Sequence, residues 1–233
     1  MPRPKSTASR RLYLQIADRL RTVMYQSDFT SQGRLPPERA LAERLGVSRP
    51  SIREALVALE LEGRVEIRMG SGVYLTQMQE APGQSLPSEM GNSLSDIMGA
   101  RAIFEGVIAA LVAPLAKPRD IKALRTIYQS MEQACQSGQI PAGSDRAFHI
   151  RIAQMTGNEV LVQTVARLYD ERRDPIAAAL LEHYEPEDSW FTALYEHREI
   201  LDAIEARDAI QAQAAMQRHL KLSLKRTMSR RDG

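Results

Sequence analysis

Three of the four histidines lie where an amphipathic helix is expected to be apolar, and one of them follows an aspartate by one helical turn. His149 comes four residues after Asp145 and directly after Phe148, so both polar side chains share or border the buried helix face. His197 and His219 each interrupt a further apolar stripe. Burying so many polar groups costs free energy unless a common partner satisfies them.

A divalent metal ion is such a partner, because imidazole and carboxylate ligands both suit borderline first-row ions. The candidate metal ligands are Asp145, His149, His197 and His219. Zinc is the first expectation, with nickel or manganese as alternatives, and open coordination positions could take oxygens of a small molecule. Any one of these histidines taken alone could instead be a hydrogen-bonded core residue. The fourth histidine, His183, lies in a polar turn and is expected to be solvated.

Arg101 is the one charged residue in an apolar stripe that predicts a long helix. The stripe consists of Leu94, Ile97, Arg101, Phe104, Ile108, Leu111 and Leu115. The planar guanidinium of Arg101 suits bidentate binding of a carboxylate, so Arg101 and the nearby Glu105 are candidate effector-binding residues. Arg101 could instead extend to the surface along its apolar stem. Glu105 could hold Arg101 in place, or it could be a surface charge.

The N-terminal third of the chain is basic, although the net charge of the 233 residues is only +2. Residues 1–79 hold 13 Lys and Arg against 8 Asp and Glu, whereas residues 80–233 hold 18 against 21. This asymmetry favours an anionic partner at one end of the chain.

The elements in this basic part predict a winged helix-turn-helix. Apolar spacing predicts a helix at about 10–26, a second from Pro36-Pro37 to Gly46, and a third that begins at Ser48 and ends at Gly63. Two alternating stretches at 65–67 and 73–75 predict a hairpin. The third helix would enter the major groove, where arginine recognises guanine. The candidate DNA contacts are Arg39, Ser48, Arg49, Ser51, Arg53, Arg68, Gly70, Ser71 and Gly72, although a lone arginine can also simply solvate a surface.

The rest of the chain predicts a mainly α protein with a second, all-helical domain. Residues 77–92 have the Pro, Gly and Ser content of a linker between a DNA-binding domain at 1–76 and a domain at 93–233. After the long helix, five more are expected at about 118–137, 143–156, 158–182, 188–206 and 208–229. Together they form a bundle of about six helices.

Composition limits the function classes. No apolar run approaches the ~20 residues of a membrane span, no secretory leader is visible, and the single Cys135 excludes a disulfide framework. A cytoplasmic protein is therefore expected. A metal-dependent hydrolase is an alternative, but no HExxH helix, nucleophile elbow or phosphate loop is present. A metal-sensing regulator would use the same ligands without needing Arg101.

The motif LPPERALAERLGVSRPSIREAL followed by MGSGVYL, within residues 35–75, resembles the DNA-binding domain of the GntR family of bacterial repressors. The resemblance implies that Arg39, Arg49 and Arg53 contact operator DNA and that the wing around Gly70 reaches the minor groove. It also implies a homodimer on a pseudo-palindromic operator.

The pattern D-x-x-x-H with two later histidines resembles the FCD effector domain of the FadR subfamily. That resemblance implies that Asp145, His149, His197 and His219 are metal ligands, that Arg101 meets the effector, and that the effector is a small carboxylate. The segments RRLYLQIADRLR and WFTALYEHREILDAI are similar to the hexuronate-responsive ExuR and UxuR branch, which implies a sugar acid. The linker and the LLEHYEPED turn depart from that branch.

Overall fold

The computed structural model describes residues 12–24, 33–68, 70–76, 92–184 and 189–228. Their contacts divide the chain into two compact units. The first unit holds the described residues up to Leu94 together with 174–183, and the second holds residues 95–173 with the described residues of 184–230. The predicted limits of the two domains stay a prediction, because most of the linker at 77–92 lies outside the described residues.

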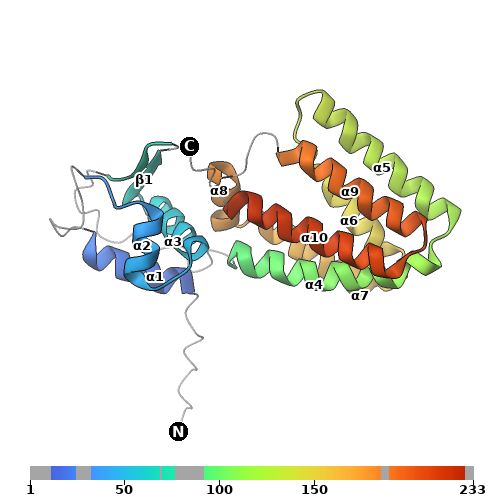
Figure 1. Cartoon of the computed structure of the whole chain (residues 1–233), viewed down its shortest axis with the longest axis horizontal. Coiled ribbons are helices and arrows are strands. Elements are labelled where there is room, and N and C mark those ends of the chain that lie inside the picture. Colours follow the sequence, from blue (N-terminus) through green and yellow to red (C-terminus); the bar gives the residue numbers. More distant parts are fainter. Residues whose placement is uncertain (1–11, 25–32, 69, 77–91, 185–188, 229–233) are drawn as a thin grey trace, which may run out of the picture. The chain divides into compact units, whose positions relative to one another are not determined.

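The first unit contains three helices and a hairpin in the predicted order (Figure 1). The elements are α1 (Leu12–Val23), α2 (Glu38–Leu45), α3 (Arg49–Leu61), β1 (Val65–Arg68) and β2 (Gly72–Leu75). Helices α1 and α2 both pack against α3, burying Tyr13, Ile16 and Leu20 of α1 with Ile52 and Leu56 of α3. The winged helix-turn-helix is thereby confirmed. The outer ends expected for the first helix, at 10 and 26, lie outside the described residues.

Short local signals set the start of α3. Gly46 ends α2 in the left-handed conformation, at φ 65°, which glycine adopts without a Cβ penalty. Ser48 then caps α3, and its hydroxyl accepts a hydrogen bond from the Ser51 N–H at 3.3 Å. The chain therefore turns sharply between α2 and α3, as a helix-turn-helix requires.

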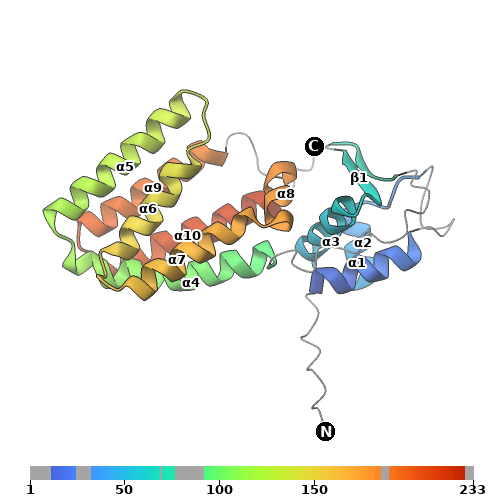
Figure 2. The same ribbon diagram turned by 180° about the vertical axis from the view of Figure 1, so that it is seen from behind.

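The described residues of the second unit form helices joined by turns and loops, with no strand among them (Figures 1 and 2). Helices α9 and α10 pack together, α5 packs on α6 and α9, and α6 packs on α7. The helices after the linker are α4 (Leu94–Val112), α5 (Pro118–Gln136), α6 (Ala142–Gln154), α7 (Glu159–Asp170), α8 (Pro175–Tyr184), α9 (Ser189–Glu205) and α10 (Ala209–Met228), with 3-10 turns at Ala113–Leu115 and Glu171–Arg173. Most of α8 belongs to the first unit.

The expectation of a single helix at 158–182 is wrong. It is divided into α7 and α8 by the turn Glu171–Arg173, and α8 begins at Pro175. Proline has no N–H to continue a helix from the preceding turn but fits the first helical position. The described residues after the linker therefore form seven α-helices rather than about six.

Helix α4 is apolar on more faces than the predicted stripe. The stripe residues Phe104, Leu111 and Leu115 are 45%, 51% and 67% exposed, whereas Ile97 and Ile108 are buried. The expectation that no apolar run approaches the length of a membrane span is wrong, because residues 94–115 are long and apolar enough to cross a membrane. However, 56% of the apolar window in this helix is buried inside the protein. Because it also buries a charged pair, described below, we interpret α4 as a core helix.

Candidate functional site

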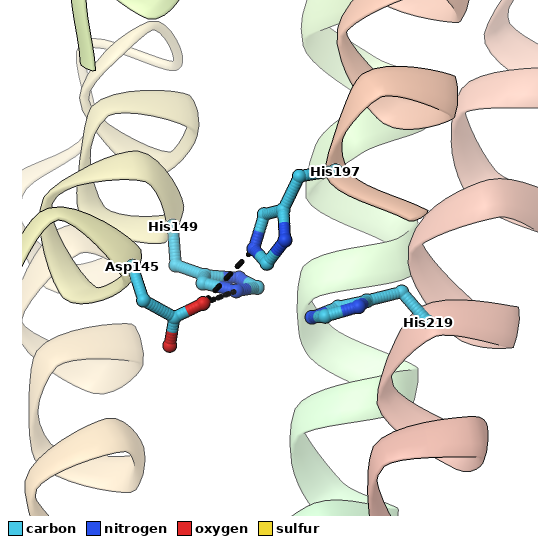
Figure 3. A group of neighbouring side chains, drawn as sticks. All are labelled: Asp145, His149, His197 and His219. Atoms are coloured by element: carbon cyan, nitrogen blue, oxygen red, sulfur yellow. Dashed lines mark ion pairs between the residues drawn. The ribbon is translucent and has the colours of Figure 1, made fainter. Parts of the chain in front are cut away.

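The structure brings Asp145, His149, His197 and His219 together inside the second unit (Figure 3). Helix α6 supplies Asp145 and His149, while α9 and α10 supply one histidine each. All four residues are buried, and one potential ligand atom from each lies within 4.8 Å of the others. Asp145 Oδ1 is 2.9 Å from His197 Nε2 and 3.8 Å from His149 Nε2.

Outer hydrogen bonds orient all three imidazole rings. The Nδ1 of His149 bonds to Glu105, and that of His219 bonds to Glu196 Oε2 at 2.8 Å. The Nδ1 of His197 donates to the Ala193 carbonyl at 2.7 Å. With every Nδ1 engaged by an acceptor, Nε2 is the nitrogen of each ring left to bind a ligand, as metal-binding histidines require.

The donor set fits a divalent ion. The Nε2 of His149 is buried and has no hydrogen-bond partner among the described residues, and such an atom is costly unless something binds it. Burial lowers the pKa of His219, and the neighbouring His197 and His149 lower it further, which keeps the imidazole neutral as a ligand must be. Burial would raise the pKa of Asp145, but the close contact with His197 and the positive charge of Arg172 hold that pKa well below its usual range.

Arg101 is buried rather than extended to the surface, at 0% exposure. Its Nε donates to Glu105 Oε1 at 2.7 Å, and its guanidinium lies 4.7 Å from the centre of the Tyr169 ring. Burial alone would raise the pKa of Glu105, but Arg101 and His149 lower it to about 2. Glu105 is thus a buried carboxylate that joins Arg101 to His149, which agrees with its expected role of holding Arg101 in place and excludes the alternative of a surface charge.

A cavity adjoins the cluster and is lined by three arginines, Arg101, Arg172 and Arg226. Its other lining residues are Asp145, Ser189, Trp190, Ala193, His219, Leu220 and Ser223. The Nη2 of Arg101 and the Nε of Arg172 are buried and lack hydrogen-bond partners among the described residues. An anionic ligand with several oxygens would satisfy both groups, because guanidinium matches carboxylate geometry.

Sequence reasoning missed Arg172, Arg226 and Glu196 as members of this site. Arg226 donates to both oxygens of Glu196, at 2.5 and 3.0 Å, and Glu196 in turn holds His219. One signal for Arg226 was present, since it follows His219 by seven residues, or two helical turns on one face. Arg172 gave no such signal, because it lies in a short 3-10 turn.

His183 lies outside the cluster and pairs with Glu60 at 2.6 Å, so the expectation that it is solvated is wrong.

The predicted DNA contacts on α2 and α3 fall into two groups. The side chain of Arg39 is 81% exposed, and Arg49 is half-buried at the first turn of α3 beside the exposed Ser48. Ser51, half-buried, contacts the Ser48 hydroxyl at 2.8 Å. Arg53 is different: its side chain has no exposed surface and donates to Glu38 at 2.7 Å. In this arrangement Arg53 joins α2 to α3, and the DNA contact expected of it would first require breaking a buried ion pair.

The predicted wing contacts lie at the hairpin. Arg68 and Ser71 are both exposed; Arg68 pairs with Glu66 at 2.7 Å, and the Ser71 hydroxyl is 2.8 Å from the Tyr74 hydroxyl. Gly70 is exposed at φ 72°, with open space where a Cβ would point. Gly72, at φ 126°, packs against a neighbouring arginine instead.

A winged helix-turn-helix with exposed arginines, in a chain whose second unit is a helical domain, is typical of a DNA-binding transcriptional regulator. The comparison with protein families agrees over most of the chain. Residues 12–75 match the gntR family of bacterial regulatory proteins, and residues 96–222 match the FCD domain. The chain belongs to the gntR family of regulators, in the group that carries an FCD domain, and is not an enzyme.

Two similar relatives come from Escherichia coli K12. The Uxu operon transcriptional regulator is 32% identical over 227 residues, which cover 93% of this chain and 86% of the relative. The Exu regulon transcriptional regulator is 32% identical over 223 residues, covering 92% and 84%. The solved structure of E. coli McbR/YncC superposes with a TM-score of 0.51 at 20% identity, covering 91% of this chain and 95% of that one, and it shares the fold.

Proposed function

We propose that a small carboxylate, a sugar acid of the hexuronate type, binds in the arginine-lined cavity beside a divalent metal and thereby controls operator binding. The observation that carries this proposal is the buried cavity wall that holds three guanidiniums next to the Asp145 and His219 side chains. The relatives named for the Uxu operon and the Exu regulon support the sugar-acid class.

In this proposal Asp145, His149, His197 and His219 hold the metal, with zinc first and nickel or manganese as alternatives. The bound ion would supply Lewis-acid coordination for effector oxygens. Arg101 and Glu105 have separate roles: Arg101 faces the cavity and binds the effector carboxylate, whereas Glu105 keeps Arg101 and the His149 ring in place. Trp190 and Ser189, which also line the cavity, offer an apolar surface and a hydroxyl that suit a sugar ring.

A regulator in which the metal itself is the signal is the second candidate, and it would use the same four ligands. It would leave unexplained the unpartnered Arg101 and Arg172 nitrogens at the cavity. The difference is measurable, because a metal sensor needs no carboxylate.

A thermal-shift screen of sugar acids and small carboxylates, with and without a chelator, tests this proposal. Stabilisation by a hexuronate that disappears when the metal is removed would support it, since a ligand that binds only the folded state raises the melting temperature. Stabilisation by metal alone, with no further response to any acid, would favour the metal sensor. Matched titrations of operator DNA then show whether the acid weakens binding, as a repressor requires, because allosteric control needs different effector affinities in the two states.

The DNA-binding form is proposed to be a cytoplasmic homodimer, because two winged helices read the two halves of a pseudo-palindromic operator. Helix α4 offers a surface for the second copy: Ile103, Val107 and Leu111, four residues apart, are 65%, 54% and 51% exposed. Val107→Asp should give a monomer in light scattering. Ile210→Asp, which adds the same charge at a 79% exposed isoleucine of α10, should remain a dimer; dimers of both variants would exclude this face.

A further inference from the structure

Arg34 is tied to the wing although it precedes α2 in the chain. The Leu35 N–H donates to the Val73 carbonyl at 2.8 Å, and the Leu75 N–H donates to the Gly33 carbonyl at 2.7 Å. Arg34 thereby lies opposite Tyr74 in an antiparallel bridge. The hairpin of β1 and β2 gains a third extended segment, and the backbone on both sides of Arg34 is fixed to it.

The guanidinium of Arg34 packs directly on Gly72. A Cβ added to Gly72 would lie 2.7 Å from Arg34 Nε and 3.1 Å from its Nη2. Any larger residue at this position would therefore displace the Arg34 head group. At Gly70, which also has a positive φ, an added Cβ would meet nothing within 4 Å. The contact with Arg34 therefore requires a residue without a side chain at position 72, whereas no such contact applies at position 70.

Arg34 and Arg68 share one aromatic neighbour. The Arg68 guanidinium lies 4.5 Å from the centre of the Tyr74 ring, and that of Arg34 lies 6.0 Å from it. Arg68 is paired with Glu66, whereas the exposed Arg34 has no carboxylate partner among the described residues. Two guanidiniums beside one ring concentrate positive charge at this side of the hairpin, and that charge attracts an anion.

We propose that Arg34 and Arg68 form a phosphate-binding pair beside the wing that grips the backbone of duplex DNA. Phosphate is the anion that a DNA-binding domain meets along its whole interface, and most protein–DNA hydrogen bonds go to phosphate and sugar. The pair positions the wing on the duplex and does not read its sequence. This inference depends on the DNA-binding class of the protein and is independent of the proposed effector and metal.

The salt dependence of binding to a labelled duplex of arbitrary sequence tests the pair in the full-length protein. Each phosphate contact contributes about 0.9 to the slope of log K against log salt concentration. Arg34→Ala should lower the slope by about that amount and weaken binding at low salt, and Arg34→Lys should retain most of the slope because it keeps the charge. The control Arg119→Ala removes an equal charge at a 79% exposed side chain of α5 and should match the wild type.

An unchanged slope in Arg34→Ala would overturn the proposal. So would equal losses in Arg34→Ala and Arg34→Lys together with a lowered melting temperature, because that result assigns Arg34 to wing stability alone. A wild-type protein that fails to bind any duplex would instead challenge the DNA-binding class, so the two failures are distinguishable.

Gly72→Ala supplies a second test through the packing contact. If Gly72 makes room for Arg34, Gly72→Ala should lower the slope in the wild type but add nothing in an Arg34→Ala background, which is the non-additivity of residues that act together. Gly70→Ala also replaces a glycine of positive φ in the hairpin, but without the contact to Arg34. It should leave the slope unchanged, and equal effects of the two glycine substitutions would count against a role through Arg34.

Discussion

Arg34, Arg39 and Arg68 of the first unit are exposed to solvent, whereas Arg101 of the second unit has no exposed surface. The exposed arginines have weak or single partners: Arg39 is 3.9 Å from Glu43, and Arg68 pairs with Glu66. Arg101 instead contacts Glu105 and the Tyr169 ring, and Glu105 also holds His149. These three arginines of the first unit are thus available to a ligand, whereas Arg101 is held in a network of buried contacts.

The exposed arginines and the buried Arg101 differ in what it costs to hold their charge. An exposed cation keeps its hydration and so has little desolvation cost. When it binds a DNA phosphate, it releases counterions that were condensed on the DNA. A buried cation costs several kcal/mol of desolvation unless it is fully paired, so the second unit must surround each charge with partners. We therefore expect substitutions of the buried charges in the second unit to change folding and ligand binding together, and substitutions of the exposed arginines in the first unit to change DNA binding alone.

The largest expected effect is on metal content. His197→Ala removes one of four ligands that the fold holds within 4.8 Å of one another, and we expect it to abolish stoichiometric zinc binding and the chelator-sensitive thermal shift. His183→Ala is the matched control, since it removes a histidine that pairs with Glu60 outside the cluster. Full metal content and full effector response in His197→Ala would show that the site is assigned wrongly.

The second largest expected effect is the loss of unfolding free energy when Arg101 is replaced. Arg101→Ala leaves the Glu105 carboxylate buried without its cation, and breaking a buried pair in this way costs about 3–5 kcal/mol of unfolding free energy. Arg198→Ala breaks an exposed pair with Asp202, at 52% and 53% exposure, and should cost at most about 0.5 kcal/mol. Urea titration of both variants measures the contrast, and similar losses in the two would remove the distinction between buried and exposed arginines.

Acid should act on the second unit through Glu105. Arg101 and His149 lower the pKa of Glu105 from 4.5 to about 2 despite its burial. A depressed folded-state pKa gives stability that is present above the unfolded value and is lost as the pH falls through the folded value, so the loss should occur between about pH 4.5 and 2 and reach roughly 3 kcal/mol. Glu105→Gln should flatten this part of the stability profile. A profile as steep as that of the wild type would mean that other carboxylates cause the acid sensitivity.

Local spacing was enough to predict much of this molecule. Gly46 and Ser48 marked the turn before α3, and the four-residue step from Asp145 to His149 put both on one buried face, because the helical period fixes which residues share a side. The winged helix and the all-helical second part followed from the same periodicity. The four predicted ligands met inside the protein although α7 and α8 separate α6 from α9 and α10 in the sequence.

Partners at long range could not be predicted from spacing. Arg53 lies where a DNA-reading residue is expected on α3, but Glu38, fifteen residues earlier, buries it. Likewise Glu196, adjacent to His197, holds His219 of the next helix. On α4 the helical period grouped Phe104 and Leu111 with the buried Ile97, yet both are exposed. The period shows which residues share a helix face, but it does not show how much of that face the neighbouring helices cover.

The smallest expected effect, and the sharpest test of the first unit, separates Arg49 from Arg53. Arg49, half-buried at the start of α3, is free of the Glu38 pair that buries Arg53. Arg49→Ala should therefore lose about 1–3 kcal/mol of discrimination between a selected operator and random duplex, the worth of one bidentate base contact, with little change in melting temperature. Arg53→Ala should lower the melting temperature, because it leaves Glu38 buried and unpaired. An Arg49→Ala variant with unchanged discrimination would rule out base reading by Arg49, and an Arg53→Ala variant that lost discrimination at full stability would restore Arg53 as a direct DNA contact.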